Sequence, residues 1–302
     1  IYVAFDSADS WAHPELFQFD EECQPVAVAG CPPDAFSATG QLWGNPLYRW
    51  DYHKKTGFSW WMKRIRFSFE LYDMVRVDHF RGFDQYYAIP FGETTAIHGA
   101  WEDGPGIAIF EKIKEVFGKV NIIAEDLGFL TPSVLKLLED TGFPGMKVLE
   151  FAFQAGEESS YLPYLYKQNC VVYTGTHDND TVVGWYRSLS PEDKKFVDDY
   201  MGIHDLDKEN PYNSCAAPTV TEKTRWEKEV SWEVIRLALA STADLAVIPM
   251  QDYLGLGTEA RINMPSTLGG NWTWRMKKGA FTPEIQKRCR QMNRLYGRRN
   301  SY

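Results

Sequence analysis

Three apolar stretches of the sequence each end in side chains that can bind a cation or move a proton. The stretches are MVRVD, NIIAED and CVVYTGTHDND, and the side chains that end them are Asp78, Glu125, Asp126, His177, Asp178 and Asp180. Carboxylates that converge without a basic cluster suit two kinds of chemistry. One is a divalent metal site built from hard oxygen ligands. The other is cleavage of a glycosidic bond, which needs one carboxylate as nucleophile and one carboxylic acid to protonate the leaving oxygen.

A single carboxylate in such a position often caps a helix or pairs with a lysine, but three strand ends in succession favour a shared site. Arg76 lies two residues before Asp78, so both side chains point to the same face of a strand and the guanidinium keeps Asp78 ionised. We favour Glu125 as the reacting acid, because side chains alternate along a strand. If the strands form a barrel, Glu125 at the strand tip can face the barrel axis while Asp126 turns away from it. By sequence alone, Asp126 and Asp180 remain alternatives.

Short apolar stretches alternate with helical patterns along the chain. Strands are expected to begin near Ile1, Met74, Val120, Met146, Cys170 and Leu245, and helices are expected over 58–73, 107–117, 131–142, 181–201 and 222–241. The repeated order of strand, helix and strand predicts a parallel sheet. In a barrel of parallel strands, the residues after the strands build the site. The sequence therefore predicts an α/β fold of the (β/α)8 TIM-barrel type with long inserted loops.

The composition fits one large domain, which we expect to cover residues 1–302. Lys and Arg total 32 against 41 Asp and Glu, a net charge of −9, which argues against nucleic acid as a partner. No stretch is apolar for the length of a membrane span, and the 5 cysteines are scattered, which favours a reducing compartment such as the cytoplasm, or the plastid stroma if the source is a plant. Aromatic residues make up 15% of the chain, and many lie in polar segments, which suits sugar rings.

Long ordered segments carry a family resemblance. RVDHFRGF, IIAEDLG and YTGTHDNDT resemble the three catalytic segments of the amylomaltases, the 4-alpha-glucanotransferases or disproportionating enzymes of the α-amylase clan. The similarity continues through GCPPDAFSATGQLWGNPLYRW, TGFPGMKVLEFAF, QDYLGLGTEARINMPST and GGNWTWRM, so it covers essentially the whole chain. Such a series of matches is far more specific than a lone short motif.

The resemblance implies a role for each matching residue. Asp78 would be the nucleophile, Glu125 the general acid and base, and Asp178 the stabiliser of the transition state. The residues that would contact substrate are Arg76 and His177, then Asp34, Phe36 and Trp43 on or beside a loop over the acceptor sites, and finally Phe151 and Asn263. The implied substrates are α-1,4-glucans and maltooligosaccharides, and neither a cofactor nor a metal is implied.

The predicted reaction is therefore a retaining transfer of glucan segments, with a retaining α-glucan hydrolase and a non-catalytic glucan-binding protein as alternatives. A retaining mechanism predicts that carboxylate oxygens of Asp78 and Glu125 lie about 5 to 5.5 Å apart. His79 is expected to be a hydrogen-bonding group behind the site rather than a direct sugar contact. The expected strands are fewer than the eight of a closed barrel, and relatives carry a further N-terminal portion. We therefore expect the chain to be the C-terminal part of a longer enzyme, with little activity and a tendency to aggregate when alone.

Overall fold

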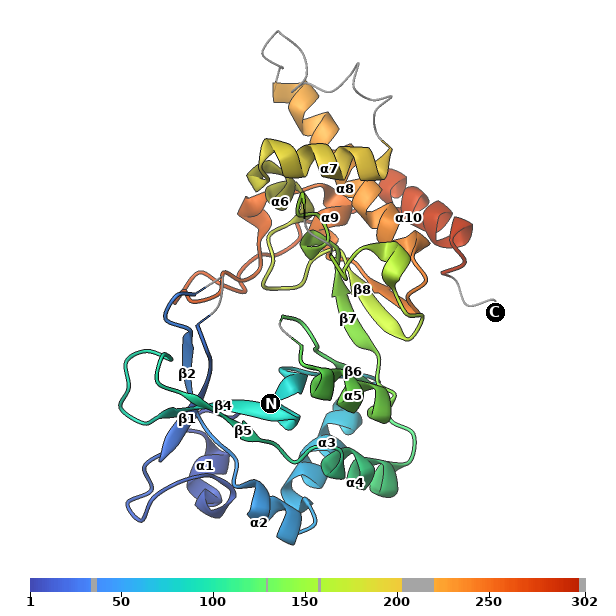
Figure 1. Cartoon of the computed structure of the whole chain (residues 1–302). Helices are drawn as coiled ribbons and strands as arrows, with labels where there is room; N and C mark the ends of the chain where they lie inside the picture. The colour runs from blue at the N-terminus through green and yellow to red at the C-terminus, as the bar shows by residue number, and fades with distance from the viewer. Residues whose placement is uncertain (34–36, 129, 157–158, 203–219, 299–302) are drawn as a thin grey trace. The chain divides into compact units, whose positions relative to one another are not determined.

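The computed structural model describes residues 1–298 except 34–36, 129, 157–158 and 203–219. The chain divides into two compact units, Ile1–Gly145 and Met146–Tyr302 (Figure 1). Within the described part of the chain, no helix is both long and apolar enough to cross a membrane.

The first unit contains both strands and helices. Its strands are β1 (Ala27–Cys31), β2 (Gln41–Pro46), β3 (Val75–Val77), β4 (Gln85–Pro90), β5 (Ala100–Asp103) and β6 (Ile122–Ala124). Its helices are α1 (Ala8–Ala12), α2 (Trp50–Lys55), α3 (Ser59–Leu71), α4 (Ala108–Phe117) and α5 (Pro132–Thr141), with short 3-10 helices η1 (Pro14–Leu16) and η2 (Phe80–Phe83).

β3 and β6 pair in parallel and confirm the strands expected near residues 74 and 120. Their register sets Val75 opposite Ile122 and Val77 opposite Ala124. The three helices expected on either side of these strands are confirmed as α3, α4 and α5. The two strands therefore end level with each other, and the residue that follows each strand lies at the same edge of the sheet.

α5 forms for the local reasons that the sequence suggests. The Thr131 side chain accepts a hydrogen bond from the Val134 N–H, and Pro132 takes the first helical position, where no N–H is needed. Gly142 ends the helix in the left-handed conformation at φ 69°. This helix matches its prediction from one end to the other.

An antiparallel sheet also lies in this unit and was not predicted. Its strand order is β2-β1-β4-β5, and all three pairings are antiparallel. Gly30 on β1 permits the close approach of β2, because a Cβ there would lie 2.2 Å from the Gln41 carbonyl oxygen. The expected strand at Ile1 is wrong, because residues 1–4 are irregular.

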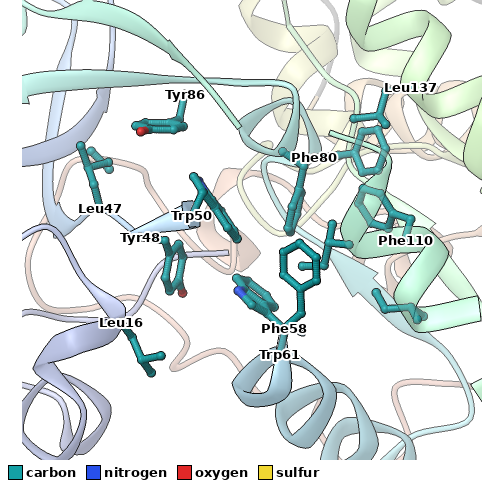
Figure 2. Close-up of a cluster of buried hydrophobic side chains, with 14 of the residues drawn as sticks. Leu16, Leu47, Tyr48, Trp50, Phe58, Trp61, Phe80, Tyr86, Phe110 and Leu137 are labelled. Atoms are coloured by element: carbon teal, nitrogen blue, oxygen red, sulfur yellow. The ribbon is translucent and has the colours of Figure 1, made fainter. Parts of the chain in front are cut away.

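The core of the first unit forms where the sheets meet the helices. Figure 2 shows Trp61 from α3, Phe110 from α4 and Tyr86 from β4 in one buried cluster. Phe80, two residues after Asp78, is fully buried in the same cluster. The polar residues after β3 are therefore anchored by a large aromatic core directly behind them.

The second unit continues the alternation of strands and helices. Its strands are β7 (Gly145–Val148), which begins at the unit boundary, β8 (Cys170–Tyr173) and β9 (Leu245–Val247). Its helices are α6 (Val182–Ser188), α7 (Pro191–Met201), α8 (Val220–Ala240), α9 (Met250–Leu254) and α10 (Pro283–Leu295), with short 3-10 helices η3 (Leu149–Phe151), η4 (Pro163–Leu165) and η6 (Thr258–Ala260). The strands form one sheet in the order β7-β8-β9, and β8 and β9 are parallel.

The helix expected over 181–201 is two helices in the structure. α6 ends at Ser188, and α7 begins at Pro191 with the Ser190 side chain accepting a hydrogen bond from the Asp193 N–H. Because proline lacks an N–H and suits the first helical turn, the Ser-Pro pair starts a new helix instead of continuing the old one.

Candidate active site

Asp78 and Glu125 directly follow the paired strands β3 and β6. The Glu125 N–H donates to the Val77 carbonyl oxygen at 2.9 Å, which extends the parallel pairing by one residue. Both carboxylate oxygens of Glu125 accept backbone hydrogen bonds, Oε2 from the His79 N–H at 2.7 Å and Oε1 from the Leu127 N–H at 2.8 Å. The backbone of the first unit thus fixes the Glu125 carboxyl beside the segment that carries Asp78.

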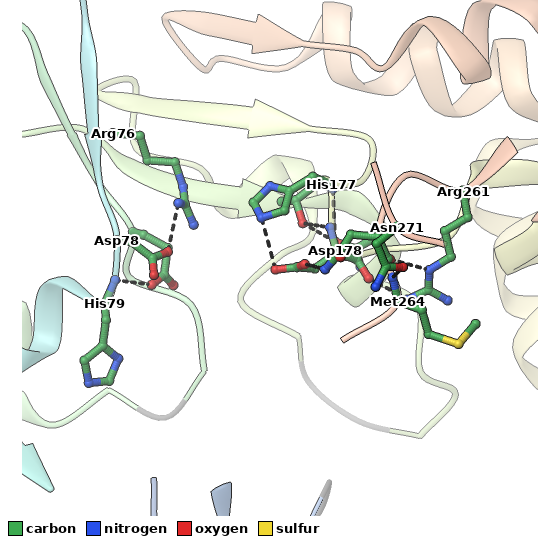
Figure 3. A network of polar contacts seen from close by, with 12 residues as sticks. Arg76, Asp78, His79, His177, Asp178, Arg261, Met264 and Asn271 are labelled. Atoms are coloured by element: carbon green, nitrogen blue, oxygen red, sulfur yellow. Dashed lines mark hydrogen bonds and ion pairs between the residues drawn. The ribbon is translucent and has the colours of Figure 1, made fainter. Parts of the chain in front are cut away.

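Arg76 makes the ion pair that its spacing predicts. Its Nη1 lies 2.8 Å from Oδ1 of Asp78, and Figure 3 shows the two side chains directed at each other. The Asp78 side chain is 62% exposed, so this carboxylate is open to an incoming group.

Burial raises the pKa of Glu125 above its ordinary value, and the charge of Asp78 raises it further. The hydrogen bonds from Leu127 and His79 and the charge of Arg76 oppose this rise. The Glu125 carboxyl is therefore buried, whereas the Asp78 carboxyl is exposed and paired with Arg76. A difference of this kind lets two neighbouring carboxyls take different roles in a reaction.

Asp126, the alternative to Glu125, faces a different environment. Only 7% of it is exposed, and a Cβ added to Gly145 would lie 2.5 Å from its Oδ2. The carboxyl is therefore packed against the backbone that leads into β7. Asp180, the other alternative, accepts hydrogen bonds from the Thr181 N–H at 2.7 Å and the Thr258 hydroxyl at 2.7 Å.

His79 connects the two carboxyl segments to an aromatic side chain. Its backbone is left-handed, at φ 48°, and its ring packs edge-on against Trp43 with ring centroids 4.9 Å apart. Burial lowers the pKa of His79 to about 4, so the imidazole is neutral at neutral pH. Its Nε2 has no hydrogen-bond partner among the residues that the structure describes. The hydrogen bond that His79 makes to Glu125 comes from its backbone, and the role of its side chain stays a prediction.

Asp178 lies in the second unit, on the loop between β8 and α6. The Asn263 amide donates to its Oδ1 at 2.6 Å, and Nε2 of His177 lies 3.2 Å from its Oδ2. The Arg261 guanidinium donates to its carbonyl oxygen at 2.6 Å. The structure therefore brings together three of the predicted residues, His177, Asp178 and Asn263. Figure 3 shows His177 and Asp178 side by side.

Two further residues of this group were not predicted. Arg261 also donates to the carbonyl oxygen of Asn263 at 2.9 Å, and it precedes Asn263 by two residues, the same spacing that singled out Arg76. The Trp272 ring packs on His177 with centroids 5.2 Å apart, and its backbone is left-handed at φ 62°. The spacing could have indicated Arg261, whereas the ring contact joins segments far apart in the sequence.

Of the remaining predicted residues, Trp43 contacts the first carboxyl pair through His79, and Phe151 packs in the second unit. Trp43 is on β2 and 36% exposed, and its indole N–H donates to the Gln41 side chain at 3.0 Å. Phe151 is 41% exposed in the second unit and packs edge-on against Tyr161. Asp34 and Phe36 lie outside the described residues.

A divalent metal site is the other chemistry that the carboxylates suit. Among the residues that the structure describes, no group of three or more His, Cys, Asp and Glu side chains has the geometry to hold a metal ion.

Comparison with known proteins agrees with the motifs. A family model described as 4-alpha-glucanotransferase matches residues 1–282. A 4-alpha-glucanotransferase from Clostridium butyricum is 48% identical over 300 residues, which are 99% of this chain and 57% of that protein. One from Thermus thermophilus is 49% identical over 294 residues, which are 97% of this chain and 56% of that protein.

The fold has a matching solved structure, that of amylomaltase from Streptococcus agalactiae in complex with acarbose. The TM-score is 0.87 at 40% identity, and the match covers 99% of this chain and 57% of that one. The chain thus spans little more than half the length of the curated relatives it matches. On the family model, the identities and the fold together, the chain belongs to the 4-alpha-glucanotransferase family.

Proposed function

We propose that the chain is a retaining 4-alpha-glucanotransferase that moves α-1,4-glucan segments between maltooligosaccharides. The observation that carries this proposal is the pair of carboxyls after β3 and β6, with Asp78 ion-paired to Arg76 and Glu125 buried enough to raise its pKa. The names of the relatives and the bound acarbose of the similar structure support the substrate class.

In the first half of the reaction, an Asp78 oxygen forms a bond to the anomeric carbon of the donor glucan. The glycosidic C–O bond breaks as Glu125 gives its proton to the departing 4-oxygen, so one carboxyl loses a proton and the other becomes the ester of a glucosyl-enzyme. This step uses Glu125 as an acid, which its raised pKa favours. In the proposed geometry the two carboxyls lie about 5 to 5.5 Å apart, which leaves no room for a water on the attacked face.

In the second half, the 4-hydroxyl of an acceptor glucan attacks the same carbon. Glu125 takes the hydroxyl proton, the bond to Asp78 breaks, and both carboxyls return to their starting states. Each step uses only carboxyls and sugar hydroxyls. If water replaced the acceptor, the same site would hydrolyse the glucan, so the assignment to transfer depends on the acceptor sites.

We assign the other predicted residues to sugar binding and charge stabilisation. Asp178 would stabilise the positive charge of the oxocarbenium-like transition state, and the bonds from Asn263 and Arg261 support that role because they fix the carboxylate and its backbone. The proposed substrate contacts are Arg76, His177, Phe151 and Asn263 beside the reacting sugar, and Asp34, Phe36 and Trp43 at the acceptor sites.

We also propose that the parallel strands belong to one (β/α)8 barrel domain. The support is the parallel pairing of β3 with β6 and of β8 with β9, and the position of the carboxyls after the strands. For localisation we propose a reducing compartment, the cytoplasm or a plastid stroma, because the cysteines are scattered along the sequence without a paired motif.

One incubation tests the proposal. The chain is incubated with maltotriose and the products are separated by length. A ladder of longer oligosaccharides supports transfer, whereas glucose and maltose alone indicate a hydrolase. Asp78→Asn is the control and should abolish the ladder. Binding of maltotriose by the parent chain without any product would indicate a glucan-binding protein instead.

A further inference from the structure

A buried carboxyl joins the two ends of the segment that carries His177 and Asp178. Asp252, on α9, is 1% exposed. Its Oδ2 accepts a hydrogen bond from the Thr174 hydroxyl at 2.6 Å, and its Oδ1 accepts one from the Val182 N–H at 2.9 Å. Thr174 directly follows β8, and Val182 is the first residue of α6. One side chain thus ties the beginning of this segment to its end.

The backbone of Asp252 is itself fixed by a contact with α8. The hydroxyl of Ser231, a fully buried residue of α8, donates to the Asp252 carbonyl oxygen at 2.8 Å. Gly255 ends α9 in the left-handed conformation at φ 60°. The carboxyl therefore projects from a short helix whose backbone is tied to the longest helix of the unit, so it is a rigid anchor.

A second buried carboxyl lies under the middle of the segment. Glu150, 8% exposed, has its Oε1 so close to the backbone that a Cβ added to Gly175 would lie 2.6 Å away. The Glu150 N–H donates to the Thr174 carbonyl oxygen at 3.2 Å. Burial, with the charges of Asp252 and Asp180, raises the pKa of Glu150 well above its ordinary value and favours its uncharged form.

Asn179 stabilises the turn that carries Asp178. Its Oδ1 accepts hydrogen bonds from the N–H of Thr176 at 3.0 Å and from the Thr176 hydroxyl at 2.8 Å, and its Cβ lies, like the Glu150 carboxyl, beside Gly175. Thr176 Oγ1 in turn accepts from the Asp178 N–H at 3.3 Å. The Thr176 and Asn179 side chains therefore hold the backbone of Asp178 in this turn, and the buried carboxyl lies directly against Gly175 of the same turn.

We propose that Asp252 and Glu150 are positioning residues of the transfer reaction, because they fix the segment from Thr174 to Val182 and so hold Asp178 where the transition state develops. This inference rests on the function proposed above. Neither side chain needs to contact the substrate. Their effect arises because a reacting or stabilising group that moves by about 1 Å can cost about 100-fold in rate.

The test uses substitutions in the 302-residue chain. Thr174→Val removes the hydroxyl that donates to Asp252, and Asp252→Leu removes both acceptors. We expect kcat for maltotriose disproportionation to fall by about 100-fold in Asp252→Leu because Asp178 is displaced, with a smaller change in KM from the displacement of His177. Thr174→Ser restores the hydroxyl and should recover most of the loss seen in Thr174→Val.

Asp198→Leu is the matched control in the same unit. Asp198 also accepts a side-chain hydrogen bond, from the Tyr186 hydroxyl at 3.0 Å, but it lies on α7 and has no role in the site. This variant should keep the parent kcat. If Asp252→Leu is too unstable to purify, the Thr174 pair carries the test alone.

Hydrogen exchange of the amides from 174 to 182 gives a readout that does not depend on activity. Exchange should be faster in Thr174→Val than in the parent, and close to the parent in Asp198→Leu. The positioning role would be overturned if the parent is active and both Thr174→Val and Asp252→Leu keep the kcat and the exchange protection of the parent. A folded parent that binds maltotriose yet makes no longer oligosaccharides, even at high protein concentration over a long incubation, rejects the proposed function itself, and this is visible before any variant is compared.

Discussion

The backbone N–H of His79 donates a hydrogen bond to the Glu125 carboxylate at 2.7 Å, although 46 residues separate the two in sequence. The bond depends on the left-handed backbone of His79, a conformation that costs about 1 kcal/mol or more outside glycine. The neighbouring residue is Asp78. The strained backbone thus sets the two carboxyls of the proposed reaction in one local framework.

The raised pKa of Glu125 predicts the pH dependence of the reaction. In the proposed reaction the acid form of Glu125 protonates the leaving oxygen, so kcat/KM should fall as the pH rises through the pKa of Glu125. Because burial raises that pKa, the fall should lie above the ordinary range of a carboxyl. Glu125→Gln should lower kcat/KM by about 10²- to 10⁴-fold. A pH profile with its alkaline fall at the ordinary value of a glutamate would contradict this.

The ion pair of Arg76 with Asp78 predicts a loss of rate when the charge is removed. A hydrogen bond to a charged group contributes about 1.5 to 3 kcal/mol, so Arg76→Met should lower kcat/KM by about 10- to 100-fold. Arg66 is the control, because it packs over the Phe117 ring from α3 and has no role in the site. Arg66→Met should keep the parent kcat/KM, and equal losses in both variants would refute the role of Arg76.

Trp43 predicts the balance between transfer and hydrolysis. If its ring holds the acceptor glucan, Trp43→Ala should shift products toward glucose and maltose, because water then occupies the acceptor site. Trp101, on β5 of the same sheet, is a closely matched control, since it is 38% exposed against 36% for Trp43. Trp101→Ala should keep the parent ratio. If Trp43→Ala keeps the parent's ratio of transfer to hydrolysis, the indole only packs against His79.

The raised pKa of Asp252 predicts how the stability of the folded chain depends on pH. Burial raises its pKa from 3.8 to about 6, so the folded chain binds the proton more tightly than the unfolded chain does. The stability that this group contributes is complete below about pH 4 and is lost as the pH rises through 6, a change on the order of 3 kcal/mol. Asp252→Asn lacks this titration. Its Tm relative to the parent should therefore rise between pH 4 and pH 7, and a constant difference would contradict the expectation.

Local signals predicted much of the framework that carries the carboxyls. α5 has a Thr-Pro start and a glycine end, and β3, β6 and β8 are short apolar stretches followed by polar residues. Because parallel strands that pair in register end together, Asp78 and Glu125 could be placed side by side from the sequence.

Other features depend on partners that are distant in sequence. The residues that follow Ile1 have a strand-like sequence, but side chains bind their carbonyl groups. The Tyr48 hydroxyl donates to the Ile1 carbonyl oxygen, and the Asn45 amide donates to the Val3 carbonyl oxygen. No strand neighbour is then needed. Likewise, the Asp252 carboxyl contacts Val182, which is 70 residues away in sequence. The sequence of its own five-residue helix contains no signal for that contact.

The bridge from Asp252 to Thr174 and Val182 also bears on protein design. A designer who wished to transplant the Thr-His-Asp-Asn-Asp segment into another scaffold would copy the loop and find it without its anchor. The smallest transferable module would need an acceptor side chain on a separate short helix that reaches both ends of the loop. It would also need the Glu150 side chain that lies against Gly175. A motif that is contiguous in sequence is here a composite of three segments of the chain.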